Sequence, residues 1–430
     1  RRISYVEMLG RVRSIAQGLL EFDLSAERPL LILSGNDLEH LQVACAALYL
    51  GVPYCPVSPA YSLVAQDYTK LQHICMLLQP GLVFAADGQA FARAIEAVVP
   101  ADTPLLLTAG EVAGRECHSF ASLLGNEACD KADVAFAATG PDSIAKFLFT
   151  SGSTKLPKAV ITTQRMLCAN QQMLLQTFPV FGEAPPVLVD WLPWNHTFGG
   201  SHNVGIVLYN GGTLYIDDGK PTPQHFAETL GNLREISPTA YLTVPKGWEE
   251  LVAALEVDAE LRETFFAQIK LFFFAGAGLS QAVWDRLDAV AEAHCGERIR
   301  MMAGIGMTET SPSCTFTTGP LSMAGYVGLP APGCKVKLVP VDGKLEGRFS
   351  GPHVMPGYWR SPEQSAAAFD EEGFYCSGDA LKLADPEHPE WGLMFDGRIA
   401  EDFKLNTGVF VSVGPLRTRV IMAGAPYIQD

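Results

Sequence analysis

Short apolar runs alternate with longer amphipathic segments through the first two thirds of the chain. A short apolar run is typical of a buried strand, and apolar residues that recur every three or four positions indicate a helix. Alternation of the two predicts mostly parallel sheets with helices packed on them, an α/β architecture. The expected strand–helix pairs are PLLILS (29–34) with NDLEHLQVACAALYL (36–50), GLVFAA (81–86) with GQAFARAIEAV (88–98), AYLTV (240–244) with KGWEELVAALEV (246–257), and KLFFFA (270–275) with SQAVWDRLDAVAEA (280–293).

Two polar patterns predict where helices begin. Asn36 followed by Glu39, and Ser361 followed by Pro362 and Gln364, are typical of helix N-terminal boxes. We therefore expect one helix to begin after each of these patterns.

The segment 41–66 contains no Asp, Glu, Lys or Arg. A membrane-spanning helix needs about 20 consecutive apolar residues in unbroken helix. Gly51 and three prolines, Pro53, Pro56 and Pro59, interrupt this segment. It is therefore predicted to be a helix, a turn and a strand in a protein core.

Beyond Gly325 the pattern changes to short alternating strands separated by Gly and Pro, in YVGLPAPGCKVKLVPVDGKLEGRFSGPHVMPGYW (326–359). This texture predicts a small antiparallel β subdomain. We expect α/β subdomains over 1–324, a β-rich subdomain over 325–397, and a hinge with the start of a further domain over 398–430.

Composition narrows the functional classes. With 47 acidic and 31 basic side chains, the 430-residue chain has a net charge of −16, which repels nucleic acid and anionic membranes. The ten cysteines include no C-x-x-C pair, so we expect reduced thiols and a cytoplasmic location. A phosphorylated ligand would need a local arrangement that overcomes the negative field.

The stretch FLFTSGSTKLPKAV (147–160) offers such an arrangement. Its glycine allows close approach of the backbone, its hydroxyls donate hydrogen bonds, and its lysines supply positive charge, as a phosphate-binding loop requires. It is not the common G-x-x-x-x-G-K-[ST] loop. Seen alone, a solvated Ser/Thr turn explains it equally well.

Three other segments carry candidate chemistry. GIGMTET (304–310) follows an apolar strand and provides a carboxylate that could hold Mg²⁺ beside a phosphate. In FYCSGDA (374–380) an aspartate could accept two hydrogen bonds from a ribose diol, and FDGRIAEDFKLNTG (395–408) contributes Arg398 and Lys404 near the expected hinge.

The four segments together, in this order and at these separations, resemble the adenylate-forming superfamily of acyl-CoA synthetases. The likeness extends over nearly the whole chain from Ser4. Within the superfamily, STKLPKAVITTQRMLCANQQM (153–173) and DWLPWNHTFGGSHNVGIVLYNGGTLYIDDGKP (190–221) are similar to bacterial feruloyl-CoA synthases.

The resemblance implies a large N-terminal α/β domain of layered, mostly parallel sheets, a small β subdomain, and a small C-terminal domain of which most is missing. It implies an AMP-forming ligase that uses ATP, Mg²⁺ and coenzyme A to activate an aromatic acid. No nucleic acid or membrane partner is expected, and a homodimer is an open alternative to a monomer.

The same resemblance assigns nucleotide contacts. Lys158 and the hydroxyl loop would clasp the β- and γ-phosphates, Thr308 would contact the α-phosphate, and Asp379 with Arg398 would hold the ribose. Glu309 and Thr154 would bind Mg²⁺. The full cofactor-binding set is Thr150, Ser151, Gly152, Ser153, Thr154, Lys158, Gly276, Ala277, Ile305, Gly306, Met307, Thr308, Asp379, Arg398 and Lys404, and the catalytic set is Lys158, His196, Thr308 and Glu309.

The acid is expected to contact a second set: Asn195, His196, Phe198, Ser201, Ala275, Gly304 and Pro312. Small residues in it suit a planar aromatic acid, and Asn195 or Ser201 could bond its phenol or methoxy group. His202 raises the question of a metal pair with His196, but no carboxylate or Cys is spaced to complete such a site.

Three positions depart from the superfamily pattern. Lys155 stands where the phosphate loop usually has glycine, Ile305 where an aromatic residue usually stacks on adenine, and Ala400 near the hinge arginine where Asp or Lys is usual. The superfamily's C-terminal lysine that attends adenylation is also missing, so a protein ending here is expected to bind ATP and acid but to adenylate poorly.

Other functions stay open at this point. GAGLSQ (276–281), after a strand and before a helix, admits a dinucleotide oxidoreductase, although a third glycine is missing and only Glu297 is spaced as a ribose acid. A non-catalytic nucleotide-binding module is a third class. Among ligases, the alternatives are a 4-coumarate, benzoate or medium-chain fatty acid ligase and a carrier-loading domain.

Overall fold

The computed structural model describes residues 1–126, 130–150, 156–222, 224–401, 403–404, 410–411 and 420. The chain divides into two compact units. Unit 1 consists of Arg1–Cys168, Pro193–Gly200 and Met355–Ser365, and unit 2 consists of Ala169–Leu192, Ser201–Val354 and Ala366–Asp430. Helix α8 (Gln164–Thr177), the π-helix η1 (Phe198–Asn203) and helix α15 (Pro362–Ala367) continue across these boundaries.

Unit 1 is built on a seven-stranded sheet with the order β5-β4-β3-β1-β2-β6-β7. All neighbouring strands are parallel except β6 and β7, which form an antiparallel pair. The strands are β1 (Leu30–Leu33), β2 (Tyr54–Pro56), β3 (Leu82–Asp87), β4 (Leu105–Ala109), β5 (Cys117–Ser119), β6 (Ile144–Thr150) and β7 (Lys158–Thr163).

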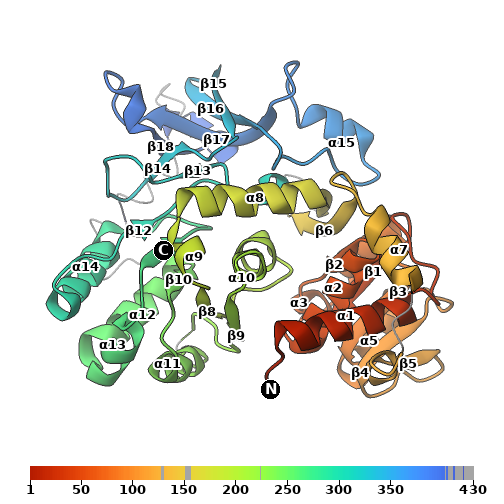
Figure 1. Cartoon of the computed structure of the whole chain (residues 1–430). Helices are drawn as coiled ribbons and strands as arrows, with labels where there is room; N and C mark the ends of the chain where they lie inside the picture. Colours follow the sequence, from red (N-terminus) through yellow and green to blue (C-terminus); the bar gives the residue numbers. More distant parts are fainter. Residues whose placement is uncertain are drawn as a thin grey trace. The chain divides into compact units, whose positions relative to one another are not determined.

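Both faces of this sheet are covered by helices, which explains the continuous apolar runs in its strands. Alternate residues of β1 point to opposite faces: Leu31 and Leu33 pack toward α4 and α5, whereas Leu30 and Ile32 pack toward α1 and α2. The strands and helices of this unit are coloured from red through orange to yellow (Figure 1). The helices are α1 (Tyr5–Leu19), α2 (Leu38–Tyr49), α3 (Ala60–Leu63), α4 (Thr69–Leu78), α5 (Gly88–Val98), α6 (Phe120–Leu123) and α7 (Asp130–Ala138).

Unit 2 contains a second α/β core, shown in green (Figure 1). Strands β10 (Ala240–Thr243), β11 (Leu271–Phe274) and β12 (Met301–Met302) form a parallel sheet, and β8 (Val187–Asp190) pairs with β9 (Thr213–Ile216). Trp248, Phe265 and Phe272 are fully buried in its core. The helices are α9 (Val180–Glu183), α10 (Val204–Tyr209), α11 (Phe226–Glu235), α12 (Pro245–Val257), α13 (Ala259–Phe266) and α14 (Gln281–Cys295).

Unit 2 also contains an antiparallel sheet with the order β13-β14-β18-β17-β16-β15. Short 3₁₀ helices flank some of these strands along the chain: η2 (Thr308–Thr310) precedes β13, η3 (Pro389–Trp391) precedes β18, and η4 (Ile399–Glu401) follows β18. The strands are β13 (Thr315–Phe316), β14 (Tyr326–Pro330), β15 (Lys335–Val341), β16 (Lys344–Ser350), β17 (Tyr375–Leu383) and β18 (Leu393–Arg398), and a separate hairpin pairs β19 (Phe403–Lys404) with β20 (Phe410–Val411).

The periodicity predictions are confirmed: each of the four expected strand–helix pairs occurs, as β1–α2, β3–α5, β10–α12 and β11–α14. The segment 41–66 forms most of α2, a turn at Gly51 and β2, as predicted, and then the short helix α3, which was not predicted. The described part of the chain has no helix with the length and apolarity needed to cross a bilayer. The proposed boundaries at 324/325 and 397/398 stay predictions.

One helix start was predicted wrongly. The residue that caps α2 is Asp37, whose carboxylate accepts a hydrogen bond from the His40 backbone at 2.6 Å. Asn36 instead accepts a hydrogen bond from the Trp194 backbone at 3.0 Å. A short polar side chain before a helix serves either purpose, so neighbouring Asn and Asp could not be told apart in sequence.

Candidate functional site

The predicted phosphate loop connects β6 to β7 in unit 1. Thr150 and Lys158 are register partners at the end of this hairpin where the loop begins. The Lys158 ammonium lies 4.0 Å from the centroid of the Tyr358 ring, a cation–π contact that holds the lysine beside the loop. The Thr150 hydroxyl is buried and has no partner within the described residues. Ser151, Gly152, Ser153 and Thr154 lie outside the described residues.

Residues 193–200 of unit 1 carry part of the predicted acyl set. The Phe198 backbone donates to His196 Nδ1 at 3.3 Å, Asn195 is half-buried, and Phe198 is buried. Nearby protein atoms desolvate His196 and lower its pKa, although the ring stays open to solvent. An exposed imidazole with a lowered pKa is neutral at physiological pH. Because Nδ1 accepts from Phe198, Nε2 carries the ring proton and can donate a hydrogen bond.

A buried lysine holds this segment in place. Lys146 in β6 is 1% exposed, and its Nζ donates to the Gly200 carbonyl at 2.8 Å. Burial lowers the pKa of Lys146 to about 7. A Cβ at Gly200 would lie 2.1 Å from the Trp194 carbonyl oxygen, so only glycine fits at the position that Lys146 contacts.

In unit 2, the segments 275–277 and 304–308, which carry predicted cofactor and acid contacts, follow the carboxyl ends of β11 and β12, where ligands bind in open parallel sheets. Gly276 adopts a left-handed conformation with φ of 89°, which favours glycine. Gly276 and Ala277 are exposed and Ala275 is half-buried, so this loop presents backbone to a ligand.

The segment 303–307 is packed against 312–317, and this packing explains its glycines. A Cβ at Gly304 would lie 1.9 Å from the Thr315 carbonyl oxygen, and a Cβ at Gly306 would lie 2.3 Å from that of Pro312. Ile305 is only 7% exposed. The missing side chain at Gly304 therefore makes room for protein backbone, and the roles of Gly304 and Ile305 toward a ligand stay predictions.

Thr308 and Glu309 form the 3₁₀ turn η2 and are 8% and 7% exposed. Thr310 fixes this turn, because its hydroxyl accepts from the Met307 backbone at 3.2 Å and donates to the Pro312 carbonyl. The Asn170 amide, oriented to suit its neighbours, donates to the Ser311 carbonyl and accepts from the Ser313 backbone, each at 3.1 Å. Helix α8 thereby anchors the turn that carries the predicted magnesium ligand.

Asp379 and Arg398, the predicted ribose pair, are brought together by the β17–β18 ladder. They are register partners, and Arg398 Nε lies 3.2 Å from the Asp379 carboxylate. Asp379 is 6% exposed, whereas Arg398 is open to solvent. The side chain of Lys404 lies outside the described part.

Ser201 begins the part of η1 that belongs to unit 2. Its hydroxyl is buried and has no partner among the residues that the structure describes. Gln171 in α8 donates to the carbonyls of Ser201 and His202 at 3.0 and 3.3 Å. Burial lowers the pKa of His202 to about 4, and its Nδ1 lies 2.9 Å from Asn203 Oδ1, which describes a neutral structural histidine.

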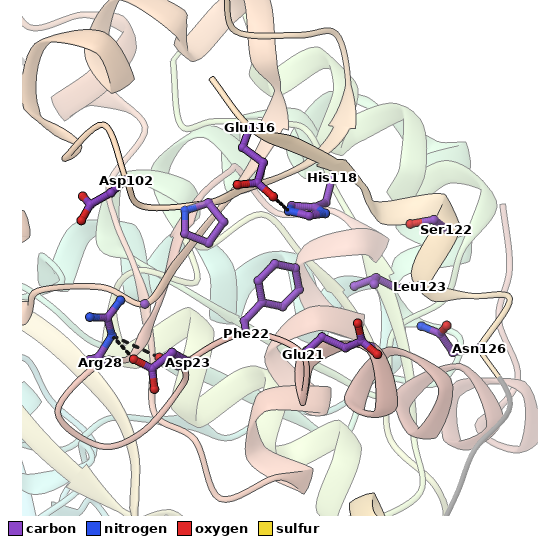
Figure 2. Close-up of a pocket in the computed structure, with 13 residues that line it drawn as sticks. Glu21, Phe22, Asp23, Arg28, Asp102, Glu116, His118, Ser122, Leu123 and Asn126 are labelled. Atoms are coloured by element: carbon purple, nitrogen blue, oxygen red, sulfur yellow. Dashed lines mark hydrogen bonds and ion pairs between the residues drawn. The ribbon is translucent and has the colours of Figure 1, made fainter. Parts of the chain in front are cut away.

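A separate pocket of about 590 Å³ lies in unit 1 and contains none of the predicted site residues. Figure 2 shows Phe22 beside His118, with Glu116 directed at the same imidazole at 3.2 Å and Arg28 directed at Asp23. Four carboxylates line it, against one arginine and one histidine. Its negative charge makes it a poor place for a triphosphate or an organic acid.

Several residues that support the site have little or nothing in the sequence that distinguishes them. A lysine inside the apolar run IAKFLFT (144–150) is the one available clue to the buried Lys146. Asn170 and Gln171 resemble ordinary helix residues, and only their contacts reveal their positions beneath the 311–313 turn and η1.

The sequence of this chain is similar to a known protein family. A sequence model of the family described as "AMP-binding enzyme" matches residues 1–359. The peroxisomal long chain acyl-CoA synthetase 6 of Arabidopsis thaliana is 26% identical over 283 residues, covering 56% of this chain and 39% of that protein. The chain spans less than half the length of such curated relatives.

Solved structures share the fold. ATP-bound MatB from Rhodopseudomonas palustris has a TM-score of 0.76 at 23% identity, with 98% of this chain and 78% of that chain covered. A malonyl-CoA ligase in a ternary product complex with methylmalonyl-CoA and AMP has a TM-score of 0.72 at 24% identity, with 100% and 82% covered. The fold is thus the α/β adenylate-forming fold of acyl-CoA ligases.

Proposed function

Because the chain belongs to the AMP-binding enzyme family, we propose that it is the adenylate-forming part of an ATP-dependent ligase that joins a carboxylic acid to coenzyme A. The observation that carries this proposal is the family match over residues 1–359, which includes the β6–β7 loop, η2 and their flanking strands. The similar structures that hold ATP, or AMP with methylmalonyl-CoA, support the same chemistry.

The reaction has two steps. A carboxylate oxygen attacks the α-phosphorus of ATP, the bond from that phosphorus to the bridging oxygen breaks, and pyrophosphate leaves. The thiol of coenzyme A then loses its proton and attacks the acyl carbon, and AMP leaves as the thioester forms. Both steps depend on positioned groups that stabilise charge on phosphate oxygens.

The residues in place suit these demands. Lys158 at the base of the β6–β7 loop supplies a cation for the β- and γ-phosphates. The Thr150 hydroxyl, which has no partner among the described residues, can donate to them. Thr308 is proposed to contact the α-phosphate, and the Asp379–Arg398 pair the ribose. His196, neutral at physiological pH, is proposed to lie along the path of the acid and thiol.

Glu309 is the described candidate for holding Mg²⁺. Its carboxylate is nearly buried in a fixed turn, and carboxylate oxygens are the ligands that Mg²⁺ prefers. Thr154, its proposed companion, lies outside the described residues. The ion would neutralise charge on the phosphate oxygens.

We further propose a hydroxycinnamate such as ferulate as the acid. The buried Ser201 hydroxyl without a described partner favours a ligand with a phenol or methoxy oxygen, and the half-buried Asn195 amide offers a second polar contact. The names of the similar proteins refer to other acids: a long-chain acyl group in one, and malonyl and methylmalonyl groups in another. Long-chain and dicarboxylic acids are therefore the second candidates. A cytoplasmic location and a homodimeric state are also proposed.

The test is thioester formation by the full-length enzyme from ATP and coenzyme A with ferulate, 4-coumarate, caffeate, benzoate, octanoate and malonate. We expect turnover with a hydroxycinnamate and a loss of at least about 100-fold in Glu309→Gln, in line with loss of a charge-stabilising group. Glu363→Gln on the exposed surface of α15 is the matched control. Preference for octanoate or malonate would overturn the acid assignment, and no AMP release with any acid would overturn the ligase assignment.

A further inference from the structure

Two cysteines and a histidine meet in the interior of unit 2. Cys314 and His353 are completely buried, and Cys334 is 8% exposed. Cys314 Sγ lies 3.8 Å from His353 Nε2, and the ligand atoms of all three residues lie within 4.8 Å of one another. Both cysteines are free thiols. None of the three belongs to the set proposed to bind ATP or the acid.

Backbone contacts hold the three residues at one end of the β15–β16 pair. The Ala331 backbone donates to the Cys314 carbonyl at 2.8 Å, and the Cys334 backbone donates to the Ala331 carbonyl at 2.9 Å. Lys335, which follows Cys334, is the register partner of Ser350, three residues before His353. The three segments that carry Cys314, Cys334 and His353, which are far apart in sequence, are therefore held next to one another.

The imidazole is also held from outside the cluster. Gly351 has a φ of 157°, and a Cβ there would lie 2.8 Å from His353 Nδ1 and 2.7 Å from the Gly333 carbonyl oxygen. This close packing keeps the ring against the turn that precedes Cys334. A preorganised ring loses little conformational entropy when it binds a ligand.

The donor set and its spacing match a soft or borderline metal ion. Two thiolates and one imidazole are ligands of Zn²⁺, and tetrahedral Zn²⁺ with Zn–S of about 2.3 Å and Zn–N of about 2.1 Å places sulfur and nitrogen about 3.6 Å apart. The observed sulfur–nitrogen distance is 3.8 Å. Mg²⁺ prefers oxygen ligands, so this cluster is distinct in chemistry from the proposed magnesium ligand Glu309.

We propose that Cys314, Cys334 and His353 form a binding site for Zn²⁺, with water or a small ligand as the fourth donor. The site would clamp the 305–314 segment, because the Cys314 backbone donates to the Ile305 carbonyl at 2.9 Å and Gly306 pairs with Ser313. A bound ion would thus stiffen the turn that carries Thr308 and Glu309.

Spectroscopy with Co²⁺ tests the site directly. The purified full chain, reduced and freed of metal with a chelator, should bind one equivalent of Co²⁺ with a thiolate-to-cobalt charge-transfer band, and Zn²⁺ should abolish the band. Cys314→Ser, Cys334→Ser and His353→Gln should each weaken binding by about 100-fold or more, beyond the 10–100-fold typical of a residue that only orients a ligand. Cys168→Ser, at an exposed position, is the control and should bind as the unsubstituted chain does.

A second measurement needs no variant and so does not depend on the folding of the substituted chains. In a sub-denaturing concentration of urea, where the buried thiols react only through local opening, Zn²⁺ but not Mg²⁺ should slow the alkylation of Cys314 and Cys334, as read by peptide mass mapping. The exposed Cys168 and Cys295 should react equally with and without metal. Absence of the charge-transfer band, unprotected thiols, or a Cys314–Cys334 disulfide in the native protein would each overturn the proposal. No readout uses ligase activity, so the proposed function is tested separately.

Discussion

Lys146 illustrates how a single residue acquires unusual properties from its surroundings. An ammonium group buried in a strand costs several kcal/mol unless it is compensated or loses its proton. Its hydrogen bond to Gly200 compensates only part of this cost, and burial lowers its pKa to about 7. His40 is buried as well, and its own burial lowers its pKa, with the charge of Lys146 as a smaller contribution. His40 is therefore neutral.

The lowered pKa of Lys146 makes stability depend on pH. The unfolded chain keeps this proton up to about pH 10.5, while the folded chain loses it near pH 7. Between these values the unfolded state binds more protons, so the free energy of unfolding should rise with pH by up to about 1.4 kcal/mol per pH unit. Denaturant unfolding between about pH 6.5 and 9.5 measures this slope.

Lys146→Met should remove this contribution, so its stability gain over the unsubstituted chain should be largest below pH 7 and shrink as the pH rises. Lys131→Met, at an exposed position of α7, should keep the original slope. Equal slopes in Lys146→Met and the unsubstituted chain would show that this lysine does not titrate near neutrality.

Asp379 provides a second prediction at this scale. Asp379→Asn removes the charge that pairs with Arg398 and one proposed ribose acceptor. Loss of a charged hydrogen bond is worth about 1.5–3 kcal/mol, so we expect the KM for ATP to rise about 10- to 100-fold with a smaller change in kcat. Glu371→Gln, exposed on the surface, is the control. An unchanged KM would remove Asp379 from the nucleotide site.

At the scale of elements, backbone packing decides what the 303–317 region tolerates. Gly304 and Gly306 let the 303–307 segment, which joins β12 to the η2 turn, lie closely against 312–317. Gly304 is also one of the small residues predicted to make room for an aromatic acid. Absence of a side chain is compatible with either explanation, and the position of Thr315 favours the backbone contact.

Gly304→Ala should therefore destabilise the protein, by roughly 1–3 kcal/mol as overpacking does, because its Cβ would lie 1.9 Å from the Thr315 carbonyl. Gly231→Ala is a matched control in α11, where a Cβ meets no atom within 4 Å and a helical alanine should slightly stabilise the chain. Thermal unfolding compares the two. A Gly304→Ala variant as stable as the unsubstituted chain would contradict the packing argument.

Helix α8 also stabilises this region, because its Asn170 binds the backbone of Ser311 and Ser313. Asn170→Ala leaves the Ser311 carbonyl and the Ser313 backbone N–H without their buried partner, which should cost about 1–3 kcal/mol. Cys168→Ala, exposed on the same helix, should be nearly neutral. If the anchoring also positions Glu309, the Asn170→Ala variant should lose thioester formation at temperatures where it remains folded.

At the scale of the whole molecule, ligand binding is expected to stabilise the folded chain. ATP with Mg²⁺ at about a hundredfold its Kd should add about 2.7 kcal/mol and raise the midpoint of thermal unfolding by about 3 °C. Chelation of Mg²⁺ should remove most of this increase. Glu309→Gln should lose it as well, whereas Glu363→Gln should retain it, and an equal increase in both would contradict the metal assignment.

The sequence by itself determined the α/β class, the positions of the strand–helix pairs and the family, because these depend on local periodicity and on motifs readable along the chain. It also predicted Asp379 and Arg398 as a pair that holds the ribose, and the structure brings these two side chains together across β17 and β18.

Only the tertiary structure decided the burial of Lys146, the anchoring of the 311–313 turn by Asn170, and the meeting of Cys314, Cys334 and His353. Each depends on contacts between residues far apart in the chain. Such contacts leave no periodic pattern, because burial, pKa and ligand geometry arise from the three-dimensional surroundings of a side chain and not from its neighbours in sequence.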